Sequence, residues 1–325
     1  MAKVAVTGAG GFIGAYLARA LADRGHDVLA MDNYSRGRPE RLDGASSNIT
    51  AIVCDVRERD ALETHFAGLD AVFHLAAING TENFYKRPQL VLDVGVRGAL
   101  AVAEACNAAK VPSMIFASSA EVYQTPEIVP TDEDVPLVLP NSLNPRYSYG
   151  GSKIISELIA FNYCRDTIDK VQCFRPHNVY GPDMGYKHVI PQLIAKIAAA
   201  AADGSGTVEL QGDGSETRAF CFVDDIVEGI ITMWQRGAHM NVYHIGSMEE
   251  VTIISLARQI AASMGVEIEF VAGEAPAGAT PRRCPDIGKM RALGYEPKVS
   301  LAEGVARTVA WYLANPAPVG GNELL

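Results

Sequence analysis

Tyr149 and Lys153, in the segment Tyr149-Gly150-Gly151-Ser152-Lys153, are the residues whose types and spacing most clearly indicate chemistry. A tyrosine and a lysine four positions apart share one face of a helix, so the ammonium is expected beside the phenol. A free tyrosine has a pKa of about 10, too high for a base near neutrality, and a neighbouring positive charge lowers it. The resulting phenolate can take the proton of a substrate hydroxyl. The same pair also occurs by chance on protein surfaces, so other residues must decide.

Ser119 favours the catalytic interpretation. It lies in Phe116–Tyr123, directly after an apolar run that predicts a strand. A doubly wound sheet places the end of that strand opposite the Tyr149 helix, so the serine hydroxyl can hydrogen-bond the reacting oxygen. Glu121 adds a carboxylate at the same place. We therefore predict Ser119, Tyr149, Lys153 and Glu121 as catalytic residues.

A glycine-rich loop near the N-terminus predicts a bound dinucleotide. The segment Thr7-Gly8-Ala9-Gly10-Gly11-Phe12-Ile13-Gly14 follows a predicted strand and opens a predicted helix. Glycine has no Cβ, so the backbone can approach a pyrophosphate at the N-terminus of that helix. Asp32 ends the next strand, where a carboxylate accepts hydrogen bonds from the adenosine ribose and repels a 2′-phosphate. NAD is therefore favoured over NADP, although Arg36 and Arg38 weaken the preference because either could meet a 2′-phosphate.

Further cofactor contacts are predicted at the ends of the following strands. Asp55 could accept the adenine amino group or, equally well, cap the helix that begins near Arg57. His74 is better explained as a packed histidine than as a catalyst, and the small residues after it let a nicotinamide ribose lie close. With NAD bound, a hydride can leave the carbon whose hydroxyl Tyr149 deprotonates. The predicted cofactor-binding residues are Gly8, Gly11, Phe12, Ile13, Gly14, Asp32, Asn33, Asp55, Val56, Leu75, Ala76, Ala77, Tyr149 and Lys153.

The order of elements predicts an α/β fold, with a doubly wound parallel Rossmann sheet and a smaller α/β substrate-binding lobe. The predicted strands are Val4–Thr7, Asp27–Met31, Ile49–Val53, Ala71–Leu75, Ser113–Ala117 and Val171–Arg175. The predicted helices are Ile13–Arg24, Arg57–Phe66, Leu90–Ala109 and Tyr147–Cys164. We expect the NAD-binding domain to span 1–177, with a return of about 219–246, and the smaller lobe to span 178–325. The tail over Asn315–Pro318 is expected to be loose.

Composition and charge limit the class of protein. A net charge of −10 argues against general nucleic-acid binding, because phosphates favour a basic surface. The six cysteines are scattered, which favours buried thiols in a reducing cytosol over disulfides or a metal site. No apolar stretch reaches membrane-spanning length, and the strand-like start leaves no room for a signal peptide. We therefore expect a cytoplasmic protein with no metal, membrane or nucleic-acid partner.

Beyond these segments, the chain resembles the extended short-chain dehydrogenase/reductase family, of the NAD-dependent nucleotide-sugar epimerase/dehydratase type. The resemblance covers essentially the whole chain. It rests on the glycine loop, the Tyr149–Lys153 pair, Arg175–Pro182, the segment from Gly212-Asp213-Gly214 to Asp225, and the ending from Asp286-Ile287-Gly288-Lys289 to Gly304. It implies that Ser119, Tyr149 and Lys153 are the catalytic trio and that the substrate is a nucleotide-diphosphate sugar.

The resemblance also implies substrate contacts. Asn178 matches an asparagine that contacts the nucleotide diphosphate, and Arg218 matches an arginine that clamps it, which suits the fork of a guanidinium. Of Arg282 and Arg283, we select Arg283 as a further candidate. Asp225 is interpreted as a cap of the helix that follows it. The predicted substrate-binding residues are Thr81, Asn83, Ser119, His177, Asn178, Arg218 and Arg283.

Three departures from the family pattern concern the site. Gly95 stands where the family usually has an asparagine, so a contact near Lys153 is missing or made by water. His177 stands where aromatic or small residues are common; packing explains it best, and a substrate contact or a second proton carrier stays open. The loop Ile78–Tyr85 is unusual and is expected to shape the sugar pocket.

Residues 120 and 121 concern the reaction. Oxidation of one sugar carbon gives a ketone, and return of the hydride to its other face gives an epimer with no net use of NAD. A 4,6-dehydratase carries Asp-Glu after the catalytic residue and a decarboxylase carries Ser-Glu, whereas this chain has Ala120-Glu121. We predict an NAD-dependent nucleotide-sugar epimerase, in the first instance a 4-epimerase. A dehydratase, decarboxylase or 4-ketoreductase stays an alternative, and a non-catalytic NAD-binding regulator is less favoured because Tyr149 and Lys153 are intact.

By analogy with the family, we expect a homodimer formed through the helix after the fourth strand and the Tyr149 helix. The apolar stripe Ile154, Ile155, Leu158 and Ile159 suits such an interface and suits core packing equally well. The sequence leaves the nucleotide and the sugar open.

Overall fold

The six strands predicted from apolar runs and a seventh strand, Asn241–Ile245, form one sheet in which every neighbouring pair is parallel. The computed structural model describes residues 1–274 and 280–316. The strand order is β11-β6-β5-β4-β1-β2-β3. These strands are β1 (Lys3–Thr7), β2 (Asp27–Asp32), β3 (Ile49–Val53), β4 (Ala71–His74), β5 (Ser113–Ala117), β6 (Lys170–Pro176) and β11 (Asn241–Ile245). The predicted fold class, a doubly wound α/β sheet, is confirmed.

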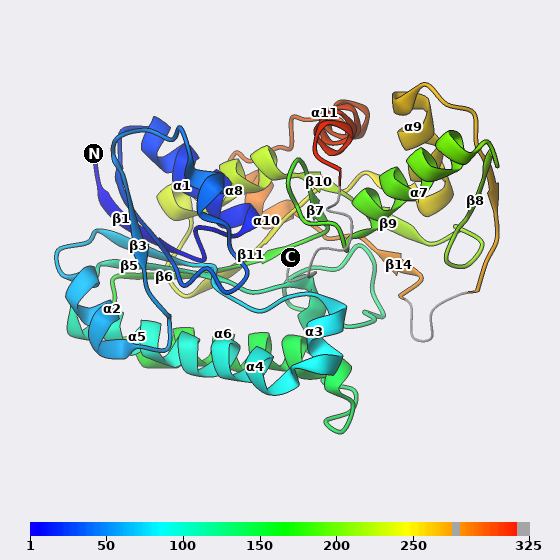
Figure 1. Cartoon of the computed structure of the whole chain (residues 1–325). Helices are drawn as coiled ribbons and strands as arrows, with labels where there is room; N and C mark the ends of the chain where they lie inside the picture. Colours follow the sequence, from blue (N-terminus) through cyan, green and yellow to red (C-terminus); the bar gives the residue numbers. More distant parts are fainter. Residues whose placement is uncertain (275–279, 317–325) are drawn as a thin grey trace.

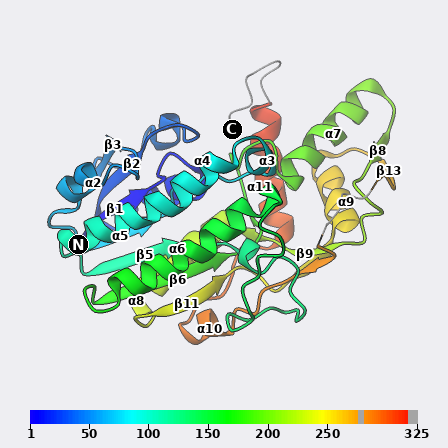
Figure 2. The same cartoon turned by 90° about the horizontal axis from the view of Figure 1, so that it is seen from below.

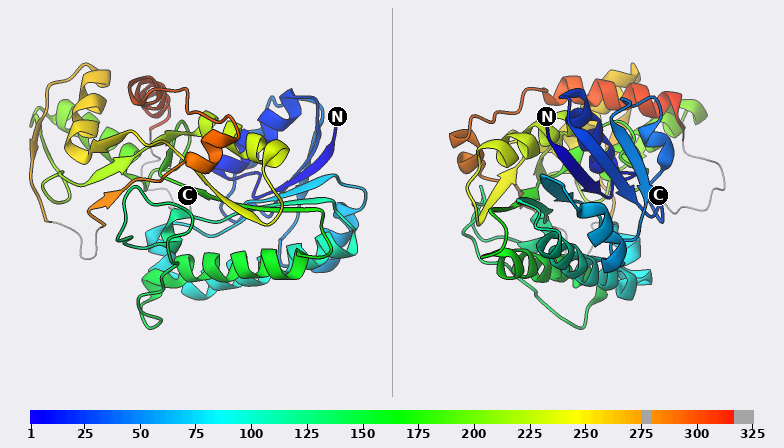
Figure 3. Two further views of the ribbon diagram at one scale, coloured as in Figure 1. Left: turned by 180° about the vertical axis from the view of Figure 1, so that it is seen from behind. Right: turned by 90° about the vertical axis from the view of Figure 1, so that its left-hand side faces the viewer.

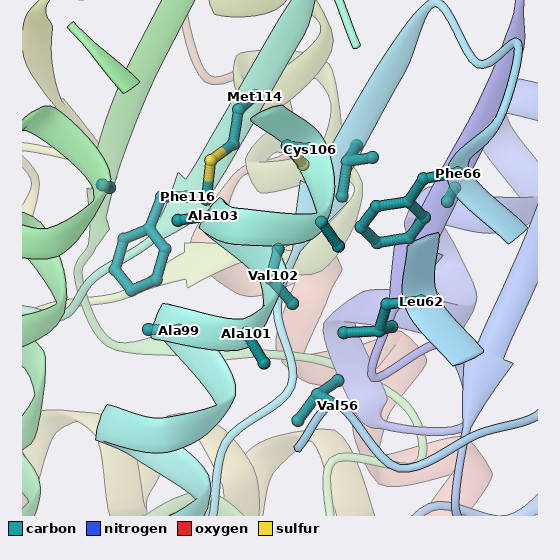
Figure 4. Packing of buried hydrophobic residues seen from close by; sticks show 14 of the residues in the cluster. Val56, Leu62, Phe66, Ala99, Ala101, Val102, Ala103, Cys106, Met114 and Phe116 are labelled. Atoms are coloured by element: carbon teal, nitrogen blue, oxygen red, sulfur yellow. The ribbon is translucent and has the colours of Figure 1, made fainter. Parts of the chain in front are cut away.

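Helices cover both faces of the sheet, because its strands are apolar on both sides (Figure 1). Every residue of β4 and β5 is buried, as expected for parallel strands between two helical layers. Figure 4 shows one of the resulting cores, where Leu62, Phe66, Val102 and Phe116 pack together. One layer contains α2 (Arg59–Phe66), α4 (Pro88–Leu92), α5 (Gly98–Ala108) and α6 (Ser148–Cys164), and the other contains α1 (Phe12–Asp23), α8 (Val223–Arg236) and α10 (Gly288–Ala292) (Figure 3).

The single helix predicted over Leu90–Ala109 is divided into three pieces. After α4, a π-helical turn (η2, Asp93–Arg97) precedes α5. The turn lies against α6 at Gly95, where an added Cβ would come within 2.8 Å of the Ser152 side chain. The carbonyl of Gly95 accepts a hydrogen bond from Ser156 Oγ at 2.9 Å. Close packing of η2 on α6 therefore explains why a glycine occupies this position.

A second group of elements lies beyond the carboxyl ends of the sheet strands (Figures 1 and 2). It has its own apolar core, to which Leu193, Ile197, Leu256, Ile260 and Val305 belong. Its elements are α7 (Val189–Asp203), β8 (Thr207–Glu209), β9 (Thr217–Ala219), β12 (Glu250–Thr252), α9 (Ile253–Met264), β13 (Glu269–Val271), β14 (Arg282–Arg283) and α11 (Leu301–Ala314). The short strands β7 (Val179–Tyr180) and β10 (Cys221–Phe222) pair with each other where the chain passes between this group and the sheet.

Two local expectations are wrong. The loop expected over Ile78–Tyr85 contains a short helix, α3 (Thr81–Lys86). Asp225 does not cap a helix that follows it, because α8 already begins at Val223. Its carboxylate instead accepts hydrogen bonds from the backbone N–H groups of Lys298 and Val299, at 2.9 and 3.0 Å. Asp225 therefore fastens the segment before α11 to α8.

All six cysteines belong to the described part of the chain, and all are buried, free thiols, as predicted. Within the same part, we find no helix whose length and apolar character would let it span a membrane. Of the tail predicted to be loose, the residues from 317 onward lie outside the described ranges.

Candidate active site

A cleft of about 1720 Å³ follows the carboxyl ends of the sheet strands and reaches the beginning of α7. Doubly wound sheets bind their ligands at this edge. The cleft wall contains every residue predicted to bind the cofactor and all four catalytic candidates. It also contains Thr81, Asn83, Asn178 and Arg283, whereas His177 and Arg218 are not among the described residues that line it.

The glycine loop shapes one end of the cleft. Gly8 has a φ of +75°, and an added Cβ there would lie 2.8 Å from the backbone nitrogen of Ala76, so only glycine fits. Gly11 and Phe12 line the cleft where α1 begins, and the N–H groups of a first helical turn favour a phosphate. The loop therefore fits the pyrophosphate of a dinucleotide.

Asp32 ends β2 and faces the glycine loop. Its carboxylate accepts hydrogen bonds from the backbone N–H groups of Tyr34 at 2.7 Å and Gly10 at 2.9 Å. Burial raises the pKa of Asp32 above its usual value, and these hydrogen bonds and the nearby Arg41 offset part of that rise. Asp32 also lines the cleft, so its carboxylate can accept hydrogen bonds from the hydroxyls of an adenosine ribose. The residues present thus fit NAD.

Asp55 is held by its neighbours at the end of β3. Arg57 donates to both carboxylate oxygens, at 2.9 and 2.7 Å, and Asn33 Nδ2 donates at 2.8 Å. These hydrogen bonds, led by those from the Arg57 side chain, hold the pKa of Asp55 far below its usual range. Asp55 Oδ1 also accepts the backbone N–H of Arg57 at 3.0 Å, but α2 begins at Arg59 with Glu58 before it, so Asp55 caps the turn that precedes the helix and not the helix itself. Asp55 therefore lines the cleft with an ionised carboxylate whose position is held by Arg57 and Asn33.

The catalytic candidates come from two elements that face each other. Tyr149 and Lys153 lie in the first turns of α6, and Ser119 follows β5. Tyr149 is buried, and the Ser119 side chain lies close enough to lower the pKa of its phenol. Lys153 is also buried; its Nζ donates to the carbonyl of Ala117 at 2.7 Å and lies 5.8 Å from the centre of the Tyr149 ring. The structure thus brings the three side chains together at one point of the cleft.

The pKa values at this point differ from the expectation. Burial raises the pKa of Tyr149 to about 12, although the nearby Ser119 side chain lowers it. Burial lowers the pKa of Lys153 to about 8. The lysine does not lower the tyrosine pKa in the described chain, because its ammonium is directed to the Ala117 carbonyl and burial outweighs the remaining attraction. A lower tyrosine pKa therefore requires a positive charge that arrives with a ligand.

The short helix α3 covers Tyr149. The ring of Phe84 stacks on that of Tyr149, with centroids 5.2 Å apart and planes at 13°, and the Arg146 guanidinium lies 5.4 Å above Phe84. Thr81 and Asn83 line the cleft beside it. Asn83 Oδ1 accepts hydrogen bonds from Arg87, whereas its Nδ2 donates to the Asn79 carbonyl at 2.8 Å, so this side chain already fastens its own loop.

Glu121 lies between two arginines. Its carboxylate binds Arg283 at 2.8 Å and Arg146 at 3.0 Å. Burial alone would raise the pKa of Glu121, but the two guanidinium groups lower it below its usual value. Glu121 is therefore ionised near neutral pH and joins three separate segments of the chain at the cleft wall.

The predicted substrate-binding residues beyond the sheet divide into two kinds. Asn178 lines the cleft and donates from Nδ2 to the Ala219 carbonyl at 3.0 Å. His177 is buried behind the wall, 4.7 Å from the His244 ring, and neither ring nitrogen has a partner among the described residues. Burial keeps the pKa of His177 well below its usual value, so the ring is neutral. Arg218 donates to the Thr217 carbonyl at 2.7 Å and lies outside the wall.

Several cationic residues of the cleft wall were not predicted as site residues. They come from segments that carry no motif by themselves: Arg36, Arg41, Arg87, Arg146 and Lys187. Arg146 had one available signal, its position three residues before Tyr149, which places it at the entry to the same helix. The sequence indicates Arg36 only as a possible partner of a 2′-phosphate, and the positions of Arg41, Arg87 and Lys187 needed the folded chain.

Comparison with known proteins identifies close relatives. The model of the NAD dependent epimerase/dehydratase family matches residues 4–246. UDP-glucose 4-epimerase of Mycolicibacterium smegmatis is 32% identical over 327 residues, covering 95% of this chain and 98% of that protein. UDP-N-acetyl-alpha-D-glucosaminuronate decarboxylase of Bacillus cytotoxicus is 31% identical over 320 residues, covering 94% and 96%.

A solved structure adds the cofactor. The dTDP-glucose 4,6-dehydratase DesIV of Streptomyces venezuelae, crystallised with NAD and TYD bound, superposes with a TM-score of 0.84. The two proteins are 30% identical, and the match covers 96% of this chain and 97% of that one. The similarity thus extends over the cleft as well as over the sheet.

Proposed function

Because the chain belongs to the NAD dependent epimerase/dehydratase family and is an NAD-dependent enzyme, we propose that it is a nucleotide-sugar 4-epimerase. The observation that carries this choice is Ala120, which lines the cleft between Ser119 and Glu121. A dehydration needs an acid to protonate the leaving hydroxyl, and an alanine cannot supply one. Oxidation and re-reduction at one carbon need no such acid.

Bound NAD supplies the acceptor and then the donor of one hydride. The chain's own residues move the proton. The Ser119 hydroxyl, which lines the cleft next to Tyr149, orients the substrate hydroxyl against the tyrosine. Tyr149 takes the proton as the carbon is oxidised and returns it after the ketone has presented its other face. The positive charge that lowers the pKa of Tyr149 for this step comes with the bound cofactor, and Lys153 lines the cleft beside the tyrosine.

We assign the rest of the substrate to the other end of the cleft. Asn178 and Arg283 contact the nucleotide diphosphate, because both line the cleft and a guanidinium matches phosphate oxygens. Thr81 and Phe84, from α3, border the sugar beside Tyr149. This assignment makes 1–177 with 219–246 the NAD-binding domain and the rest of the chain the substrate-binding part.

A specific observation favours decarboxylation of a sugar acid as the second candidate. Arg146 and Arg283 meet at Glu121, and each has one guanidinium nitrogen that is buried without a partner in the described chain. A substrate carboxylate could replace Glu121 as the partner of one arginine. The B. cytotoxicus relative is named for such a reaction.

We further propose a cytoplasmic homodimer. Leu92, Ile155 and Leu158, on α4 and α6, are each at least 41% exposed, an unusual exposure for large aliphatic side chains on adjoining helices. A second copy covering these helices would bury them. Light scattering after size exclusion is expected to give twice the chain mass, and Leu158→Glu is expected to give the monomer.

A panel of nucleotide sugars and nucleotide uronates tests the reaction. Products are followed by NMR and mass spectrometry, with NAD content measured after purification. An epimer of unchanged mass, formed without net reduction of NAD, supports the proposal. Loss of carbon dioxide from a uronate supports the second candidate, and the absence of turnover across the panel sinks both.

A further inference from the structure

The segment after β2 carries two arginines that bind one aspartate from a distant part of the chain. Arg38 pairs with Asp183, which lies between β7 and α7. Arg41 donates from Nε to the other carboxylate oxygen of Asp183 at 2.8 Å. Its Nη2 binds the first oxygen at 3.2 Å and the backbone carbonyl of Asp183 at 2.8 Å. One residue therefore binds three of the six guanidinium nitrogens of these two arginines.

Arg38 and Arg41 both contact Gly10, which binds the ribose-site residue Asp32. Asp32 accepts a hydrogen bond from the N–H of Gly10 at 2.9 Å, and Arg38 N donates to the carbonyl of Gly10 at 2.8 Å. Arg41 Nη1 donates to the same carbonyl at 2.9 Å. Gly37, the residue before Arg38, lies so close that an added Cβ would be 2.7 Å from the Asp32 carboxylate. A group attached to the ribose hydroxyls at Asp32 is thus near the Arg41 guanidinium, which lines the cleft, and near the backbone from which Arg38 extends.

The group of interest at this position is a phosphate on the ribose. A 2′-phosphate is the group that distinguishes NADP from NAD, and arginine binds phosphate through paired hydrogen bonds. Arg41 lines the cleft, whereas Arg38 does not, and the Arg38 Nε is buried with no partner within the described ranges, so its side chain has to leave Asp183 before it can meet such a phosphate. The charge of Arg38 is neutralised by Asp183.

We propose that Asp183 is a cofactor-selectivity residue: it binds Arg38 and Arg41 and so withholds them from a 2′-phosphate. Asp32 repels that phosphate directly, and Asp183 removes the cations that would otherwise attract it. Asp183 has a φ of +64°, a left-handed conformation that an aspartate adopts at some cost and that here accompanies its double contact with Arg41. The inference rests on the cofactor being NAD and is independent of the sugar reaction.

Binding of NAD and of NADP to Asp183→Asn, measured by calorimetry without any sugar, tests the proposal. Asparagine keeps the shape and one acceptor oxygen but removes the charge. NADP is expected to bind about tenfold more tightly than to the unaltered protein, while NAD affinity changes by less than about threefold. Adding Arg38→Ala, whose side chain has no other role in the glycine loop, is expected to reduce the gain, because only Arg41 is then released.

Two controls make the result decisive. Glu296→Gln removes the carboxylate of a matched surface pair, Arg291–Glu296, away from the cleft, and is expected to leave both affinities unchanged. Asp32→Ser removes the direct repulsion and establishes that the assay detects a gain in NADP binding. Equal losses of NAD and NADP affinity, with a lower melting temperature, would make Asp183 a purely structural link and overturn the proposal. An unchanged NADP affinity, or a gain that Arg38→Ala leaves undiminished, would overturn it as well.

Discussion

The two ends of the cleft are built in different ways. The cofactor end is built largely from backbone, with Gly8 against the backbone of Ala76 and the Asp32 carboxylate bound to the N–H of Gly10. The sugar end consists of side chains from distant segments, where Glu121 joins Arg146 and Arg283 and Phe84 covers Tyr149. A backbone cradle tolerates almost no change, whereas a side-chain cluster can be altered one contact at a time. The cofactor end is therefore expected to be the constant part of the enzyme and the sugar end the part that sets specificity.

The largest effect is expected where the two ends meet, at Tyr149. Tyr149→Phe removes the proton acceptor and is expected to reduce kcat about a thousandfold, the range of general acid–base catalysis. NAD affinity is expected to change little, because the phenyl ring still stacks on Phe84. Turnover on the best nucleotide sugar and calorimetric NAD binding measure both. Tyr147→Phe, outside the cleft wall, is the control. Retained turnover in Tyr149→Phe would remove the tyrosine from the chemistry.

Gly8→Ala tests whether backbone fit governs the cofactor end. The methyl group would meet Ala76 N at 2.8 Å and add the strain of a φ of +75°, so NAD affinity is expected to fall at least about tenfold. Gly44→Ala separates the two causes, because Gly44 has a φ of +66° but no atom within 4 Å of an added Cβ. It is expected to lower stability by about 1 kcal/mol and to leave NAD binding intact. Similar NAD affinities for the two variants would contradict the backbone account.

Arg283→Ala tests the sugar end. It is expected to raise the KM for the nucleotide sugar about tenfold, the loss of one charge-assisted contact, with NAD affinity unchanged. Arg282→Ala is a matched control, because its side chain is half exposed and pairs with Glu250 outside the cleft. Equal effects of the two substitutions, or a loss of NAD binding in Arg283→Ala, would show that the ends are not separable in this way.

The same division explains what could be predicted from the sequence. The glycine loop, Asp32, Ser119 and Tyr149 lie within short segments whose spacing carries their chemistry, and the structure places all of them in one cleft. The pairing of Glu121 with Arg283 depends on two positions 162 residues apart, and no local pattern encodes it.

The departures have local physical reasons. The π-helical turn at Asp93–Arg97 follows from the close packing of Gly95 on α6, which a helical periodicity does not reveal. α3 forms in a segment too short for its pattern to be distinguished from a loop. The pKa of Tyr149 differs from expectation because burial depends on Phe84, a contact made only in the folded chain.

The smallest effect is expected in the free energy of unfolding, which the buried ammonium of Lys153 lowers. Lys153 lies where the two ends of the cleft meet. Burial lowers the pKa of Lys153 to about 8, from 10.5, so the folded protein holds this proton less tightly than the unfolded chain does. Between these two pH values the unfolded chain binds more protons, and stability rises with pH. Below pH 8 the penalty for the buried ammonium is fully present. Lys153→Met removes the penalty and loses one hydrogen bond to Ala117, so it is expected to raise the free energy of unfolding by about 1 kcal/mol at pH 7.

The gain should shrink as the pH approaches 10, where the lysine of the unaltered protein is neutral when folded. Denaturant unfolding at pH 7 and pH 10 measures it. Lys196→Met is the control, because Lys196 donates to the Glu209 carbonyl at 2.9 Å from an exposed position and is expected to show no such pH dependence. A Lys153→Met protein that is less stable at pH 7, or whose difference is the same at both pH values, would mean that burial is not what lowers this pKa. A gain in the free energy of unfolding that disappears with rising pH would instead show that the buried Lys153 ammonium destabilises the folded protein. Lys153 lies where the cofactor end and the sugar end of the cleft meet, so both ends depend on this destabilising charge.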